Sequence, residues 1–180
     1  DIPFISNIIK NDFDKLFFVL DTNNLQPSKF NLAYDSLKVS KIEGSISYQI
    51  SEKLKADAIG RFYSYELKNN SYAWYMPQFE FITRASYNLF KKFIFNVDLT
   101  VETGRKMLLI NEEEGSFIEN DQIIKDLGAL FDMNIGVEYR YNKRISAFVQ
   151  FNNTAAQRYL KWHNYPVQGF QLMGGVTARF

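Results

Sequence analysis

The stretch Leu130-Phe-Asp-Met-Asn-Ile-Gly-Val-Glu-Tyr-Arg-Tyr141 decides the fold, because apolar and polar side chains alternate along it without a slip. Successive residues of a β-strand point to opposite faces of a sheet, so this period of two predicts a strand with one oily and one charged face. The oily side carries Phe131, Met133, Ile135, Val137, Tyr139 and Tyr141, and the polar side carries Asp132, Asn134, Gly136, Glu138 and Arg140.

The same alternation recurs along most of the chain. It predicts strands near residues 37–51, 53–66, 76–89, 93–104, 128–141, 144–151 and 170–180, and an eighth is expected at Asp12 to Leu20. Seventeen Phe, eleven Tyr and two Trp against four Pro also favour strands. The apolar phase switches between Leu37 plus Val39 and Ile42, which indicates either a β-bulge or emergence from a membrane.

Three features distinguish a membrane barrel from a soluble meander. The predicted strands are about ten residues long, enough to cross a bilayer at a tilt, whereas the apolar runs are far too short for a spanning helix. Tight links at 51–53, 90–92 and 142–143 alternate with long ones at 105–127 and 152–168, as short periplasmic turns and long outer loops do. We therefore expect residues 1–180 to form one domain, a transmembrane antiparallel up-and-down β-barrel of about eight strands. It is either a whole small barrel or the last part of a larger one.

A repeat around each tight link is the third feature. Each of three segments places Tyr just before a basic turn: Ser47-Tyr-Gln-Ile-Ser-Glu-Lys-Leu54, Ser86-Tyr-Asn-Leu-Phe-Lys-Lys-Phe93 and Glu138-Tyr-Arg-Tyr-Asn-Lys-Arg-Ile145. Aromatic side chains gather where a barrel meets the membrane surface. The predicted aromatic girdle consists of Tyr48, Tyr87, Tyr139, Tyr141 and Phe180.

Polar residues on the opposite side of these strands mix both signs of charge almost evenly. The predicted lumen-facing set is Glu43, Lys55, Asp57, Arg61, Glu80, Arg84, Asp98, Glu102, Asp132, Glu138, Arg140 and Arg179. These side chains are expected to pair across strands and to rigidify the interior. The alternative is a polar pathway or a lining that contacts solute.

Other kinds of site find little support. The chain has no Cys and a single His163 in a loop beside Trp162, so neither a catalytic set nor a metal site is expected, and no cofactor. The acidic segment Asn111 to Ser116 is interpreted as a solvated loop tip. A net charge of +1 gives no reason to expect nucleic acid. Helical spacing in Thr154 to Trp162 indicates a helix that packs over the barrel mouth or binds a protein partner.

The C-terminal segment from Arg158 to Phe180, with Trp162, Tyr165, Gly169 and a final Phe, resembles the C-termini of Bacteroidetes-type outer-membrane barrels, including TonB-dependent receptor-like proteins. The resemblance extends more loosely through Phe30-Asn-Leu-Ala-Tyr-Asp and Tyr48-Gln-Ile-Ser-Glu-Lys-Leu. It implies a bacterial outer-membrane location, contact with outer-membrane lipid, and recognition of the Phe180 strand by the barrel-assembly machinery. It also implies part of a receptor or transporter for solutes. A structural barrel that binds partner proteins at its outer loops is the alternative, since no plug domain or TonB box is visible in these residues.

Overall fold

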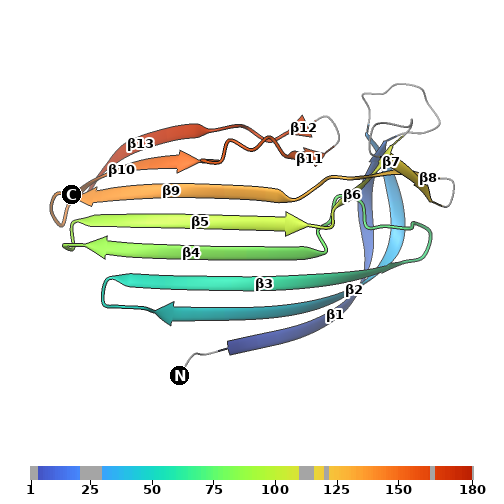
Figure 1. The fold of residues 1–180 in the computed structure, drawn as a ribbon, viewed down its shortest axis with the longest axis horizontal. Coiled ribbons are helices and arrows are strands. Elements are labelled where there is room, and N and C mark those ends of the chain that lie inside the picture. The colour runs from blue at the N-terminus through green and yellow to red at the C-terminus, as the bar shows by residue number, and fades with distance from the viewer. Residues whose placement is uncertain (1–3, 21–29, 110–115, 120–121, 163–164, 180) are drawn as a thin grey trace.

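The computed structural model describes residues 4–20, 30–109, 116–119, 122–162 and 165–179, and its long strands form one antiparallel sheet. In their order across the sheet, the eight strands are β1 (Phe4–Leu20), β2 (Phe30–Gln49), β3 (Leu54–Leu67), β4 (Phe79–Leu89), β5 (Phe93–Thr103), β9 (Leu130–Arg140), β10 (Ile145–Asn152) and β13 (Gln171–Ala178). Long strands that follow one another in the chain also lie side by side in the sheet (Figure 1). The predicted all-β, up-and-down antiparallel order is confirmed.

The strand register gives the two faces of the sheet different characters. Directly paired residues share a face, so a row of cross-strand neighbours shows what that face presents. One row crosses seven strands and is apolar apart from a single tyrosine hydroxyl: Tyr48, Ala56, Ala85, Val97, Ile135, Phe151 and Leu172. A row on the other face consists of Glu43, Arg61, Glu80 and Glu102. We call these the apolar face and the charged face.

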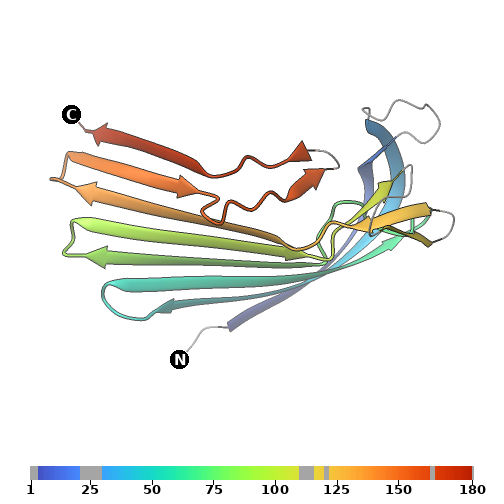
Figure 2. The same cartoon turned by 45° about the horizontal axis from the view of Figure 1, so that its top comes forward.

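The sheet is open within the described residues. β1 and β13 are its two edges, and no described strand pairs with the outer side of either one. They lie at opposite sides of the sheet in both views (Figure 1 and Figure 2). Closure of these eight strands on themselves, one of the two expected arrangements, is therefore not what the described residues show.

The two long links contain short strands that the alternation did not predict. β6 (Lys106–Leu109), β7 (Ser116–Glu119) and β8 (Gln122–Asp126) form a small sheet in the order β6-β8-β7, and β11 (Leu160–Trp162) pairs with β12 (Tyr165–Pro166). The helix expected over Thr154 to Trp162 is wrong. The backbone there turns at Asn153 and Ala156, which both have positive φ. The side-chain amide of Asn153 donates hydrogen bonds to the backbone carbonyl oxygens of Gln157 and Gln168, which stabilises this turn in place of a helix.

A small hydrophobic core covers the charged face at its long-loop end. Leu37 of β2 packs with Ala73 and Trp74 of the 68–78 loop and with Leu108 and Ile124 of the small sheet. We call this unit, the 68–78 loop together with β6, β7 and β8, the cap. Leu37 lies on the same face as Glu43, and β2 pairs with β3 without any shift of register. The bulge interpretation of the phase switch is therefore wrong: the face becomes apolar because the cap covers it.

Hydrogen bonds to Asp35 fix the 68–78 loop of the cap to β2, and the same loop closely approaches Gly104. The buried carboxylate of Asp35 accepts hydrogen bonds from the backbone and side-chain nitrogens of Asn69 and Asn70, at 2.8 to 3.1 Å. Burial raises the pKa of Asp35, but these hydrogen bonds outweigh it and leave the pKa below its ordinary value. Gly104, at φ +74°, starts the turn into β6, and a Cβ there would lie 2.8 Å from the side chain of Gln78.

Candidate functional site

The centre of the charged face is an ion-pair network around Arg61. Its Nε donates to Glu43 of β2 at 2.8 Å, and its Nη1 donates to Glu80 of β4 at 2.8 Å. Lys41 Nζ lies 2.7 Å from the same Glu43 oxygen, and the Tyr63 hydroxyl lies 3.4 Å from Glu80. One guanidinium thus ties three neighbouring strands together, because its planar fork presents donors in two directions.

A second row of charged side chains lies on the same face, nearer the short turns, and is more exposed than the network around Arg61. Lys55 Nζ is 3.3 Å from Asp57, whose carboxylate also accepts a hydrogen bond from the Ser47 hydroxyl. Arg84 Nε is 3.3 Å from Asp98 on the next strand. The register also places Asp57 directly opposite Arg84. Charges of opposite sign therefore alternate across β3, β4 and β5.

The remaining predicted polar residues lie on the same face, toward its two ends. Glu102 and Asp132 approach the cap end, and Glu138, Arg140 and Arg179 lie at the short-turn end. Arg140 Nε donates to Glu138 at 2.9 Å. The structure thus brings the whole predicted set onto the charged face, although its role as a lumen lining stays a prediction.

Sequence reasoning missed Arg105, which lies in a link where no periodicity marks it. Its side chain is 2% exposed, with Nη1 donating to the Leu160 carbonyl at 3.1 Å and Nε 3.8 Å from Glu102. Within the described part of the chain, Nε and Nη2 have no hydrogen-bond partner. Burial lowers the pKa of Arg105, whereas Glu102 and Tyr159 act to raise it. Arg105 fastens β11 against the end of the charged face.

The apolar face is uncovered. Its large side chains are exposed, among them Ile42, Phe62, Val97, Val149, Leu172 and Val176. Of the predicted girdle, Tyr48 is 49% exposed and Tyr141 is 66% exposed, while the Tyr139 ring stacks at a tilt 4.8 Å from the ring of Phe93. Tyr87 is also exposed on this face. Soluble monomers rarely expose an apolar surface that extends over so many strands.

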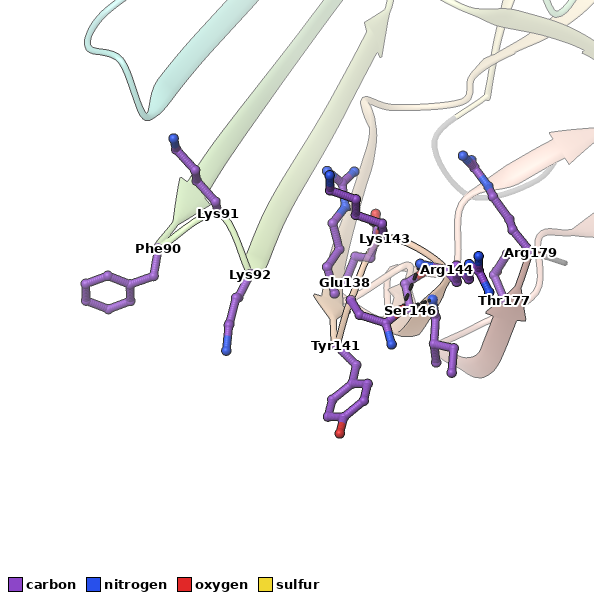
Figure 3. A pocket seen from close by; sticks show the side chains of 13 residues that line it. Phe90, Lys91, Lys92, Glu138, Tyr141, Lys143, Arg144, Ser146, Thr177 and Arg179 are labelled. Carbon is purple, nitrogen blue, oxygen red and sulfur yellow. Dashed lines mark hydrogen bonds and ion pairs between the residues drawn. The ribbon is translucent and has the colours of Figure 1, made fainter.

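The short-turn end of the charged face holds a basic hollow of about 620 Å³. Figure 3 shows Lys91 and Lys92 from the β4–β5 turn on one side, and Lys143, Arg144 and Arg179 on the other. In the same view the Lys92 side chain points away from Lys91, to the side on which Phe90 and Tyr141 also lie (Figure 3). The sequence marked these turns as basic but did not reveal that they converge.

Several expectations fall on residues that are not described. Phe180, His163 and residues 111–115 of the acidic segment lie outside the described residues, as does the side chain of Trp162. In the part of the chain that is described, no helix has the length and apolarity needed to cross a membrane. The described residues also contain no cluster of three or more His, Asp or Glu side chains placed to hold a metal ion.

Comparison with protein-family models gives no match, and comparison with curated proteins gives none either. Among solved structures, the chain is similar to the ferric-catecholate import receptor Fiu of E. coli K12 in its closed form, with a TM-score of 0.65 at 12% identity. The likeness is one of fold. The match covers 98% of this chain and 25% of the receptor, so the chain spans about a quarter of the length of the protein it resembles.

Proposed function

We propose that this chain forms part of the wall of a bacterial outer-membrane β-barrel of the import-receptor type. In this arrangement the apolar face contacts lipid and the charged face lines the interior along which a solute passes. The observation that carries the proposal is the exposed apolar row across seven strands, backed by a charged face whose central charges are paired. A bilayer accommodates such a sheet without a second layer, because lipid covers one side.

The open edges support a wall within a larger barrel. An unpaired strand edge leaves backbone N–H and C=O groups without partners, and such edges do not occur in contact with the hydrocarbon core. β1 and β13 therefore require further strands on their outer sides. The similarity to a quarter of the length of an import receptor supports the same arrangement. We further propose, from the resemblance of the C-terminal segment, that the protein is of the Bacteroidetes type and is not an enzyme.

These 180 residues contain no cysteine, so labelling of a single introduced Cys tests which face meets lipid, once any cysteine elsewhere in the full-length protein has been replaced by serine. Val97 and Asn96 are neighbours on β5, so they lie at nearly the same depth but on opposite faces. Each is replaced by Cys in the full-length protein and labelled with an environment-sensitive fluorophore in isolated outer membranes. The Val97→Cys label should emit at shorter wavelength and be quenched by spin-labelled lipid. The Asn96→Cys label should be quenched by iodide in the water phase.

The opposite pattern, or quenching of both labels by iodide alone, contradicts the membrane wall. The latter result would fit a sheet covered by another protein layer. A second experiment separates the receptor from the alternative of a structural barrel. It compares the uptake of iron from a ferric catecholate in a strain that carries the gene for this protein and in a strain from which the gene is deleted. A receptor for this solute class loses uptake in the deletion strain. A structural barrel leaves uptake unchanged and co-purifies with partner proteins.

A further inference from the structure

The short-turn end of the charged face concentrates positive charge. Six side chains form what we call the basic cluster: Lys91, Lys92, Arg140, Lys143, Arg144 and Arg179. Among the described residues, one carboxylate, that of Glu138, lines the same hollow, and it is already bonded to Arg140. Within the described residues, the other five cations form no ion pair. The centre of the charged face differs, because there each cation faces a carboxylate.

Hydrogen bonds to the backbone hold the turns that carry these cations next to one another. The Arg140 N–H donates to the Lys92 carbonyl at 2.7 Å, which joins the β4–β5 turn to the end of β9. The Arg179 N–H donates to the Arg144 carbonyl at 2.8 Å, which joins the end of β13 to the β9–β10 turn. The Asn142 side-chain oxygen accepts from the Arg144 N–H at 2.7 Å and fixes that turn. The backbone positions from which the cations project are therefore fixed before any ligand arrives.

Such a grouping costs free energy by mutual repulsion unless an anion neutralises it. The geometry points to a site for a small soluble polyanion with phosphate or carboxylate groups, and we propose that the hollow binds one. Its volume of about 620 Å³ is in the range of small-molecule sites. Arginine forks pair with two oxygens of such groups, and lysine ammonium groups add charge and further donors.

A membrane-surface belt of cations fits these observations less well. A belt would recur at every short turn, yet the β2–β3 turn carries Glu52 beside Lys53. Arg140, moreover, belongs to the charged face, directly opposite Ser146, and not to the face that would contact lipid. The proposal goes beyond the wall function and does not depend on it, since binding is measured on the protein in detergent.

The test uses inorganic pyrophosphate as probe and titration calorimetry on the full-length protein in detergent. The unmodified protein should bind pyrophosphate, and the double variant R144Q/R179Q should bind it about a hundredfold more weakly, since each of the two lost charge-assisted contacts is worth roughly tenfold. The matched control K53Q/K68Q removes the same charge from exposed positions outside the cluster and should bind like the unmodified protein. Raising the salt concentration should weaken binding to the unmodified protein.

Absence of binding to the unmodified protein at millimolar pyrophosphate, or equal binding by R144Q/R179Q, overturns the proposal. If that variant fails to fold, K91Q/K143Q, at exposed turn positions, replaces it with the same expectation. Nanodiscs with and without phosphatidylglycerol supply the lipid arm. Pyrophosphate binding that is unaffected by the anionic lipid supports a soluble ligand. Complete displacement of pyrophosphate by phosphatidylglycerol refutes the assignment to a solute. None of these outcomes bears on the cysteine-labelling test of the wall.

Discussion

Replacing Arg61 by methionine should destabilise the sheet, mainly by leaving Glu80 without a cation. The side chains of Arg61, Glu43 and Glu80 are 26%, 20% and 17% exposed, so water screens their contacts only in part. At an effective dielectric constant of about 20, two charges 2.8 Å apart attract by about 6 kcal/mol, most of which the cost of dehydration cancels. Glu43 keeps Lys41 at 2.7 Å, whereas Glu80 keeps only the Tyr63 hydroxyl. We expect a loss of about 2–3 kcal/mol.

A double-mutant cycle with R61M, E80Q and R61M/E80Q tests this reasoning. Unfolding by guanidinium in detergent, followed by the change in gel mobility of the unheated protein, gives the free energies. E80Q in the R61M background should restore about 1–2 kcal/mol, because it removes the uncompensated charge. The control R84M breaks a pair whose side chains are 67% and 49% exposed, and should cost less than about 0.5 kcal/mol. Equal losses for R61M and R84M, or a zero coupling energy, would refute the argument.

Three further predictions concern backbone conformation and pH. Gly104→Ala should cost about 1–3 kcal/mol, because of its positive φ and its close neighbour, whereas Gly60→Ala, with no atom within 4 Å, should be nearly neutral in the same unfolding assay. Phe90 and Lys91 both adopt positive φ, a conformation that Asn and Gly tolerate better. The double variant Phe90→Asn/Lys91→Gly should therefore raise the free energy of unfolding by about 1 kcal/mol. An unchanged or lower free energy of unfolding argues against backbone strain in this turn. Because the pKa of Asp35 is depressed, its contribution to stability is present above the ordinary aspartate pKa and is lost as pH falls through the folded value. Asp35→Asn should flatten this acid limb when denaturation midpoints are measured from about pH 7 to about pH 3.

The sequence predicted the strands well where the two faces of the sheet meet different surroundings. Leu130 to Tyr141 alternates because one face of the sheet is apolar and the other is polar along the whole strand. The interpretation of the phase switch near Leu37 as a β-bulge was wrong, because the charged face lies beneath the cap there and carries apolar residues. The cap core joins three segments that are distant in the sequence, and a periodic pattern carries no record of such contacts.

The candidate site was predictable as a face but not as a set of partners. Alternation alone indicated that Glu43, Arg61 and Glu80 point the same way. Which carboxylates Arg61 reaches depends on strand register, and a shift of two residues would preserve the pattern while changing every pair. The basic cluster was missed for a similar reason. Each turn looked basic on its own, and only the lateral order of β5, β9, β10 and β13 brings the turns together.

The way in which the cap's small sheet joins the main sheet bears on how this protein can diversify. The chain leaves the sheet after Thr103 and returns at Leu130, whose register partner is Glu102. The two ends of the inserted segment therefore meet on adjacent strands, a spacing that a short hairpin turn also spans. The length and composition of the segment between Thr103 and Leu130 can change without moving any strand of the main sheet, since surface insertions add little to the entropy cost of loop closure. The small sheet can therefore vary while the main sheet stays as it is.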